Sequence, residues 1–279
     1  MVEGVKRGQA AIVRMRGSAQ HRRRSVKMRR CSPREAPIVQ ANPAILSSAL
    51  GSLFPAAAVV AELRDPGEIS LLLPAEAAYL GRSVPKRARE FAAGRLCARR
   101  ALAEFGIADF PIEVAADRRP LWPPSIVGSI THTDGFCAAV VAERSSLVSI
   151  GIDSEGAESV KPELWESICV ADEIAWLNSL AATQRRAAAT LMFSAKEAFY
   201  KCQYPLTLQF LGFLDVQVQL PDWGAQRGIF TIAANRDIEV ADHAVFPMCG
   251  RYLFHEQFVT AALCLPAASA KIPAAPKDQ

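Results

Sequence analysis

Two acidic residues, Asp153 and Glu155, end an apolar run in the segment VSIGIDSE, Val148–Glu155. On an extended strand, residues two apart project from the same face, so these carboxylates lie side by side where the strand should be buried. They repel each other unless a cation joins them, and Mg²⁺ typically takes one or two carboxylates together with waters and substrate phosphates. The spacing therefore allows a magnesium site, but a strand that frays into solvent here would explain it equally well.

A second charged group falls in FSAKEAFYKC, Phe193–Cys202, which has helical spacing. Phe193, Glu197 and Lys201 share one row of such a helix, while Lys196 is turned about a quarter-circle away. An exposed Glu–Lys pair at this spacing contributes only about 0.2–0.5 kcal/mol. Because the row begins in an apolar neighbourhood, we expect Glu197 and Lys201 to meet the interior or a cleft, where unpaired charge is costly. A third carboxylate for a metal and a lysine for its phosphate would satisfy both groups.

Two further features are able to contact phosphate, although each has a simpler explanation. His132 lies in GSITHTDGF, between a β-like approach and a glycine turn, where a lone histidine is most often structural. A helix expected over Pro85–Gly106 carries a cationic face, which is most often simply solvated. The basic residues of this face are Lys86, Arg87, Arg89, Arg95, Arg99 and Arg100.

The elements that must hold these residues begin with a buried strand, expected within Phe54–Leu63. The helix over Pro85–Gly106 follows and ends at its glycine, which is a plausible C-cap. A loop with three prolines, Asp117–Ser125, leads into two apolar runs, Phe136–Ala142 and Leu147–Ile152. The short ERSS link between these runs predicts a hairpin.

The second half of the chain is expected to open with two helices, over Pro162–Leu180 and from about Thr183 to Cys202. Strands follow in FLDVQVQL, GIFTIAA and FVTAALCL. Strands and helices do not alternate as in a parallel βαβ series. The predicted class is therefore α+β, in two subdomains that divide near Ser149.

The composition is that of a globular protein, with 51% hydrophobic and 22% charged residues among 279. The net charge of +4 arises in the first 40 residues, which hold 11 of the 32 basic residues but only Glu3 and Glu35 of the 28 acidic ones. The rest of the chain is acidic overall and gives no argument for nucleic-acid binding. Seven scattered cysteines without a CxxC pair fit a reducing compartment, so the cytoplasm is expected. Residues 36–61 lack charge but are too rich in proline and serine for a membrane span.

Taken in order, VGSITHTDGFCAAVVA, IGIDSE and FSAKEAFYKC resemble the motifs of the 4′-phosphopantetheinyl transferase superfamily. The closest likeness is to its surfactin-type branch, as represented by the enterobactin synthase component D group. EFAAGRLCARRAL and RRPLWP resemble the N-terminal half of that family, and the likeness spans roughly Val59–Leu265. It implies an enzyme that moves the 4′-phosphopantetheine arm of coenzyme A onto a carrier-protein serine and releases adenosine 3′,5′-bisphosphate. It also implies two similar α/β subdomains related by a pseudo-twofold, with the active site between them.

The resemblance implies roles for individual residues. Asp153, Glu155 and Glu197 match the Mg²⁺ ligands, and Lys201 matches the lysine that contacts the pyrophosphate. Glu197 is the candidate general base, directly or through a water, and with Asp153 and Lys201 it forms the catalytic set. The implied coenzyme contacts also include Arg87 or Arg89, and Arg95, toward the adenosine-side phosphate; Arg119 with Pro120; Ser129, Ile130, Thr131 and His132, the last toward the 3′-phosphate; and Lys196.

Two positions depart from the family pattern, because Ser154 replaces an apolar or small residue and Gly156 replaces a common proline. Neither removes a ligand, although the loop after the metal site is expected to be more mobile. The implied subdomains are 46–148 and 149–268, between a basic tail at 1–45 and a tail at 269–279, both expected to be disordered. The expected partners are coenzyme A and acyl, peptidyl or aryl carrier domains of fatty-acid, polyketide or siderophore pathways, and the expected state is a monomer.

Two alternatives stay open. A Mg²⁺-dependent phosphohydrolase that acts on coenzyme A or a nucleotide would use the same carboxylates and lysine. A nucleic-acid-binding protein would rely on HRRRSVKMRR in the tail, which lacks interleaved aromatic residues. A zinc site is not supported, because the histidines and cysteines have no ligand-like spacing.

Overall fold

The computed structural model describes residues 45–64, 67–81, 83–235 and 247–267. The tail expected over 1–45, except for its last residue, and the tail expected over 269–279 lie outside these ranges. Inside them, no helix has both the length and the apolar character needed to cross a membrane. Helices and antiparallel strands are mixed along the chain, which confirms the α+β class.

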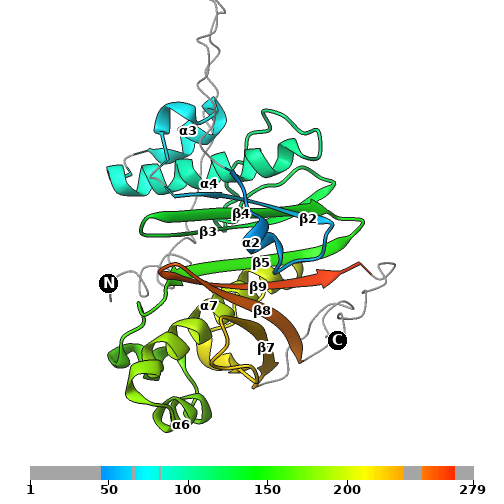
Figure 1. The fold of residues 1–279 in the computed structure, drawn as a ribbon. Helices are drawn as coiled ribbons and strands as arrows, with labels where there is room; N and C mark the ends of the chain where they lie inside the picture. The colour runs from blue at the N-terminus through cyan, green and yellow to red at the C-terminus, as the bar shows by residue number, and fades with distance from the viewer. Residues whose placement is uncertain (1–44, 65–66, 82, 236–246, 268–279) are drawn as a thin grey trace, which may run out of the picture. The chain divides into compact units, whose positions relative to one another are not determined.

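The first half of the fold is a four-stranded antiparallel sheet covered by the long helix α4 (Figure 1). The strand order is β1-β2-β4-β3. Helix α4 buries a row of alanines with Leu96 and Leu102 against β2 and β4, and Gly106 follows it at a φ of 70°. The elements are β1 (Ile45–Leu46), α2 (Ser48–Gly51), β2 (Ala58–Leu63), the 3₁₀ turn η1 (Ile69–Leu71), α3 (Pro74–Leu80), α4 (Pro85–Ala103), β3 (Ile126–Thr133) and β4 (Phe136–Glu143).

The second half is a five-stranded antiparallel sheet of order β5-β9-β8-β7-β6, against which the 26-residue helix α7 packs. Strands β5 and β9 carry most of the contact with this helix. The elements are β5 (Leu147–Gly156), the 3₁₀ turn η2 (Pro162–Leu164), α5 (Trp165–Ile168), α6 (Ala171–Ser179), α7 (Ala182–Thr207), the 3₁₀ turn η3 (Phe213–Asp215), β6 (Val216–Gln219), β7 (Arg227–Ala234), β8 (Met248–His255) and β9 (Phe258–Pro266).

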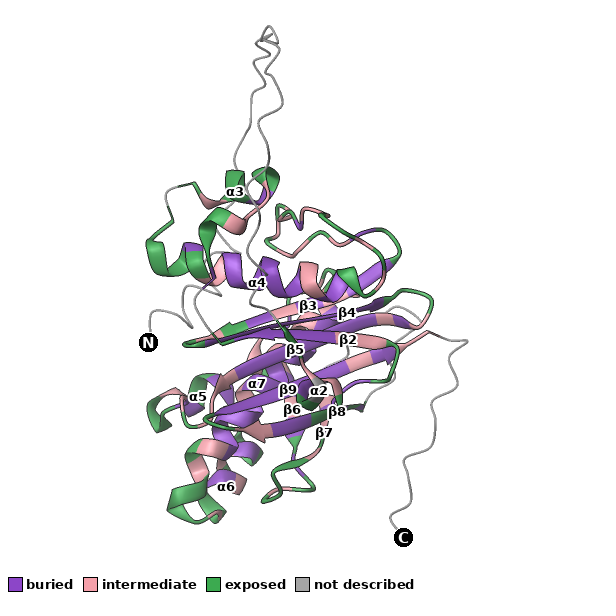
Figure 2. Ribbon diagram, turned by 45° about the horizontal axis from the view of Figure 1, so that its top comes forward, coloured by how far each residue is buried: buried purple, intermediate pink, exposed green. Residues whose placement is uncertain are grey.

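The two sheets share an apolar core. Val60 and Val140 of the first sheet lie in one buried cluster with Ile150 and Leu253 of the second. Separate clusters join α4 to the first sheet and α7 to the second, so the two long helices cover the outer faces. Figure 2 shows the strands between them as largely buried. This layering brings the end of β3 next to β5, where the charged residues of interest gather.

The hairpin predicted across ERSS is wrong. Strand β4 is already paired on both edges, with β3 and with β2, so no edge is left for β5. Strand β5 instead enters the second sheet and pairs with β9 over almost its whole length. The hairpin of this region is β3–β4, which closes at the turn through Gly135. The link at 144–146 therefore connects two sheets.

The helix predicted over Pro162–Leu180 is interrupted. Cys169 and Val170 are extended, and the Glu173 carboxylate accepts the N–H of Val170 to start a new helix there. The following helix, in contrast, runs beyond its predicted end at Cys202 and carries Pro205 in its last turns. Strand β8 was not among the predicted strands, because Gly250 interrupts the pattern of its sequence. The structure requires glycine at this position, since a Cβ there would lie 2.1 Å from the Phe230 ring.

Candidate active site

The candidate site forms where α7 lies directly on β5. Gly151 permits this approach, because a Cβ at that position would stand 1.8 Å from the carbonyl oxygen of Ala198. Two hydroxyls then hold the contact: Ser194 donates to the carbonyl of Asp153 at 2.9 Å, and Ser149 donates to the carbonyl of Cys202 at 2.5 Å. This packing brings the two charged segments of the sequence to one place.

Asp153 is at the centre of the site and only 5% exposed. The Lys201 ammonium donates to its Oδ1 at 2.7 Å and to the carbonyl of Ile152 at 3.1 Å, and Thr131 donates to the same Oδ1 at 3.4 Å. Its Oδ2 is buried without a hydrogen-bond partner. Burial raises the pKa of this carboxyl, although the charge of Lys201 opposes the shift. One oxygen of a buried carboxylate is therefore left unsatisfied.

Glu155 and Glu197 complete a group of three carboxylates around Lys201. Burial and the charge of Asp153, with a smaller part from Glu197, raise the pKa of Glu155 to about 8. Burial and the charge of Asp153 raise the pKa of Glu197 to about 7. Burial alone would lower the pKa of Lys201, but the three carboxylates outweigh it and raise that pKa. The single lysine does not offset the repulsion among the three acids.

The donor chemistry of this group fits a hard divalent cation. Three carboxylates supply oxygen ligands, and the orphaned Oδ2 of Asp153 is an acceptor with no partner of its own. Among the described residues, however, no three His, Cys, Asp or Glu side chains already converge at metal-ligand geometry. The charges of the three acids act on one another, but their side chains do not converge on one point.

Strand β3 borders the site and is joined to β5 by two side-chain hydroxyls. Ser129 accepts the N–H of Ile152 at 3.2 Å, and Thr131 accepts the N–H of Ser154 at 2.8 Å. These bonds connect the edges of the two sheets beside Asp153. Ile130 points the other way, toward α4, where a Cβ on Gly94 would lie 2.9 Å from its side chain. Ser129 and Thr131 therefore position the site strand.

His132 lies at the end of β3, surrounded by cations, and 39% of its side chain is exposed. Its pKa is lowered to about 4, first by the low-dielectric walls around the ring and then by the charges of Arg87, Lys201 and Arg95. The ring is consequently neutral, and Glu90, 4.0 Å away, forms no ion pair with it. Residues of α4 and α7 thus raise the positive potential at one point, which suits phosphate groups.

The arginines predicted to form a solvated cationic face on α4 are not all exposed. Arg87 and Arg89 are exposed, but Arg95 is only 8% exposed. The Arg95 guanidinium lies 3.8 Å from the centre of the Phe91 ring, its Nε donates to the carbonyl of Ile112, and burial lowers its pKa to about 10. Arg95 therefore contributes its positive charge to the surroundings of His132 from a buried position.

Comparison with known proteins decides the family. The curated 4′-phosphopantetheinyl transferase Npt of Nocardia iowensis is 37% identical over 181 residues, which are 63% of this chain and 80% of that protein. The chain belongs to the 4′-phosphopantetheinyl transferase superfamily. Two family models agree: the 4′-phosphopantetheinyl transferase N-terminal domain matches residues 75–142, and the 4′-phosphopantetheinyl transferase superfamily matches 149–261. The predicted family and enzyme class are confirmed.

Other relatives of this transferase carry similar names. The 4′-phosphopantetheinyl transferase Svp of Streptomyces mobaraensis is 41% identical over 57% of this chain and 65% of that protein. Enterobactin synthase component D of Escherichia coli (strain K12) is 36% identical over 52% of this chain and 66% of that protein. The likeness to this last group was predicted from the motifs.

Lys196 of the transferase does not lie where a coenzyme contact was predicted. Its ammonium is buried and donates to the carbonyl of Ile168 at 2.8 Å, to Glu173 at 2.6 Å and to the carbonyl of Phe213 at 2.9 Å. An ammonium has three donors, so all of them are used inside the protein. The prediction for Lys196 is therefore corrected: it is a structural ion pair.

The loop that carries Arg119 and Pro120 reaches the same region of the transferase. A bridge between Val114 and Pro120 closes this loop, and the Nε of Arg119 lies 3.0 Å from Asp117 in an ion pair. That Nε is buried and is not aligned for a hydrogen bond, so we read the contact as electrostatic. Asp117 is close enough to α7 for its charge to act on Tyr200.

Tyr200 was not predicted as a site residue. Burial raises its pKa, with further contributions from Tyr204, Glu197 and Asp117. Its ring stacks on Tyr204 at a centroid distance of 5.2 Å, and the charges of Glu197 and Asp117 both reach it. Its place between Glu197 and Lys201 in the motif is a signal, but spacing alone did not separate it from the residues that face the core.

Proposed function

We propose that this transferase moves the 4′-phosphopantetheine arm of coenzyme A onto a serine of an acyl, peptidyl or aryl carrier protein, releasing adenosine 3′,5′-bisphosphate in a Mg²⁺-dependent reaction. The observation that carries the proposal is the group of three carboxylates around Lys201, with one oxygen of Asp153 buried and unpartnered. A site that binds a cation and a pyrophosphate would satisfy that oxygen and relieve the repulsion.

Asp153, Glu155 and Glu197 would hold the magnesium ion. When bound, the ion would neutralise charge on the pyrophosphate of coenzyme A. A cation would also oppose the raised pKa values of Glu155 and Glu197, which burial and then the charge of Asp153 cause.

The transfer forms one bond to phosphorus, breaks another and releases the proton of the carrier serine. The carrier serine oxygen forms a bond to the phosphorus that bears the pantetheine arm, and the bond from that phosphorus to the bridging oxygen breaks. The leaving group is adenosine 3′,5′-bisphosphate. Glu197 accepts the proton of the serine hydroxyl as the candidate general base, a role that typically accelerates a reaction about 10²- to 10⁴-fold. Lys201 turns from Asp153 toward a pyrophosphate oxygen and keeps its charge.

The adenosine side of the coenzyme is assigned to the end of β3 and to α4. Neutral His132 donates to the 3′-phosphate, and Arg87, Arg89 and Arg95 provide the positive potential around it. Arg119 and Pro120 contact the coenzyme from the loop that the Val114–Pro120 bridge closes. Ser129, Ile130 and Thr131 place the strand, and Lys196 has no part in binding. The subdomain boundaries, the pseudo-twofold, the monomeric state and the cytoplasmic location stay predictions.

The test is to measure both products with coenzyme A, Mg²⁺ and an apo carrier protein. Transfer predicts equal amounts of adenosine 3′,5′-bisphosphate and of carrier that bears the arm. The phosphohydrolase alternative predicts phosphopantetheine free in solution and unmodified carrier, and that result would overturn the proposal. Deleting residues 1–40 tests the other alternative, because transfer survives this loss whereas nucleic-acid binding by the tail does not.

A further inference from the structure

A buried carboxylate, Glu173, ties three elements of the second half together. Its Oε2 accepts the N–H of Val170 at 2.8 Å, which caps its own helix, and also pairs with the Lys196 ammonium at 2.6 Å. Its Oε1 accepts the N–H of Val218 in β6 at 2.6 Å. Lys196 in turn donates to the carbonyl of Ile168. We call Glu173, Lys196 and these backbone partners the second clamp.

The first half contains the same arrangement around Glu76, which is fully buried. Its Oε2 accepts the N–H of Leu73, capping α3, and pairs with Arg99 of α4. Its Oε1 accepts the N–H of Ile112 at 3.0 Å. Arg99 also donates to the carbonyl of Leu71 at 2.6 Å. We call this set the first clamp.

The two clamps correspond position by position. In each, the glutamate is the third residue of a short helix, the cation follows it by 23 residues on the next long helix, and that cation donates to the carbonyl two residues before the helix cap. The residue that follows the cation has a different role in each of the two long helices. In α4 it is Arg100, which forms a surface pair with Glu104 four residues on. In α7 it is Glu197, with Lys201 four residues on.

We propose that the second clamp positions Glu197, and that Lys196 and Glu173 are positioning residues for the transfer reaction. This inference rests on the proposed function of the site. Where α7 approaches β5 most closely, the backbone of Ala198 lies against Gly151, and no large side chain fits between them. The clamp supplies a fixed point on another side of α7 and ties it to α5, α6 and β6.

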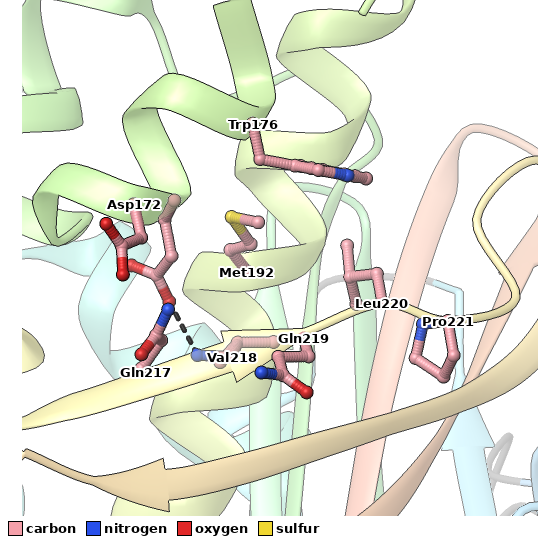
Figure 3. Close-up of a pocket in the computed structure, with 9 residues that line it drawn as sticks. Asp172, Trp176, Met192, Gln217, Val218, Gln219, Leu220 and Pro221 are labelled. Carbon is pink, nitrogen blue, oxygen red and sulfur yellow. Dashed lines mark hydrogen bonds between the residues drawn. The ribbon is translucent and has the colours of Figure 1, made fainter. Parts of the chain in front are cut away.

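The packing next to the second clamp is open, which leaves the polar bonds to hold it. A pocket of about 330 Å³, open to solvent, lies between α6, α7 and β6, and Trp176, Met192, Val218 and Leu220 line it (Figure 3). Close-packed interiors resist shifts of their elements, and no side chains fill this pocket to do so between α6, α7 and β6. The bonds of Glu173 to Val218 and to Lys196 therefore fix the distance from β6 to α7.

The test compares the two clamps. Lys196→Met and Arg99→Met each remove the cation from an equivalent ion pair, so both are expected to lower the melting temperature. Only Lys196→Met should also lower kcat, by roughly 10²-fold, the effect of misplacing a catalytic group by about 1 Å. At saturating Mg²⁺ the KM for coenzyme A should change less than about twofold, because ground-state binding is then retained. Lys196→Met should also weaken Mn²⁺ binding, measured by electron paramagnetic resonance on the protein without substrates.

Lys196→Arg should restore kcat and Mn²⁺ affinity, since arginine fills this place in the first clamp. If Lys196→Met does not fold, Lys196→Met with Glu173→Gln removes both buried charges and carries the same expectations. Wild-type kcat and Mn²⁺ affinity in the folded variant, or an equal loss of kcat in Arg99→Met, would overturn the inference. If the wild type transfers nothing to any carrier but Lys196→Met still weakens Mn²⁺ binding, the proposed function fails and the positioning role stands.

Discussion

Lys201 donates to one oxygen of Asp153 at 2.7 Å, while the other oxygen of that carboxylate is buried with no partner. Only one oxygen of the Asp153 carboxylate thus has its hydrogen bonds, and Glu155 and Glu197 add two further carboxylates beside it. A purely structural ion pair in a protein interior is expected to satisfy all of its acceptors, as Glu173 and Glu76 do in the two clamps. This contrast distinguishes the Asp153 group from the ion pairs of the two clamps, whose carboxylate oxygens are all hydrogen-bonded.

Glu197→Gln should cripple turnover. The amide keeps the size of the side chain but accepts no proton from the carrier serine, so kcat should fall by about 10²- to 10⁴-fold. Steady-state kinetics with a carrier protein measure the loss. Glu158→Gln is a matched control, because Glu158 is an exposed acid beyond the end of β5 whose partner is Arg186. Near-wild-type kinetics in Glu197→Gln would remove the assignment of the base.

The stability of the metal-free protein should fall as the pH rises from about 6.5 to about 8, since below this window the lowered pKa of His132 acts in the opposite direction. Over this window Glu155 and Glu197 hold protons in the folded state that the unfolded chain has released, because their pKa values are raised to about 8 and about 7 from 4.5. The free energy of unfolding decreases wherever the folded state binds more protons. Magnesium should restore it at the upper end. Melting temperatures in EDTA and in Mg²⁺ at several pH values test this, and a flat profile in both would contradict it.

Gly151→Ala should destabilise the protein and separate α7 from β5. Its Cβ would overlap the carbonyl oxygen of Ala198, and overpacking of this kind costs about 1–3 kcal/mol or more. Gly156→Ala is the matched control on the same strand, since its Cβ would find only Ser159 at 3.9 Å. Urea unfolding of both variants gives the comparison. Equal stability of the two would mean that the close approach at Gly151 is not needed.

Thr131→Val should weaken the joint between the two sheets. It leaves the buried N–H of Ser154 without an acceptor, which costs about 1–3 kcal/mol, and it removes a donor to Asp153. Thr131→Ser keeps the hydroxyl and should remain close to wild type. Thr133→Val, two residues along the same strand, controls for the loss of a hydroxyl. The account would be wrong here if Thr131→Val unfolded at the same urea concentration as Thr133→Val.

The sequence alone was sufficient for the parts of the site that depend on local spacing. The two-residue step from Asp153 to Glu155 and the four-residue step from Glu197 to Lys201 follow from strand and helix geometry. In the structure, Asp153 and Glu155 on β5 and Glu197 and Lys201 on α7 form one group, as these two spacings predict. The motif order also identified the family correctly, because three motifs in sequence are far more specific than one.

Long-range partners were beyond sequence reasoning. Lys196 looked like a free cation beside Glu197, but its acceptors come from Ile168, Glu173 and Phe213, which no periodicity places near it. The break in the helix at Cys169 depends on the same cluster. The false hairpin had a similar origin, since β4 was already paired with β2, a strand more than 70 residues earlier.

The most direct test of the account is the intact mass of an apo carrier protein after incubation with coenzyme A, Mg²⁺ and the transferase. Wild-type enzyme should add one phosphopantetheine to the carrier, and EDTA or Asp153→Ala should abolish the addition. An unchanged carrier across a panel on which a control transferase succeeds, or undiminished modification by Asp153→Ala, would contradict the central claim that this carboxylate site transfers the arm.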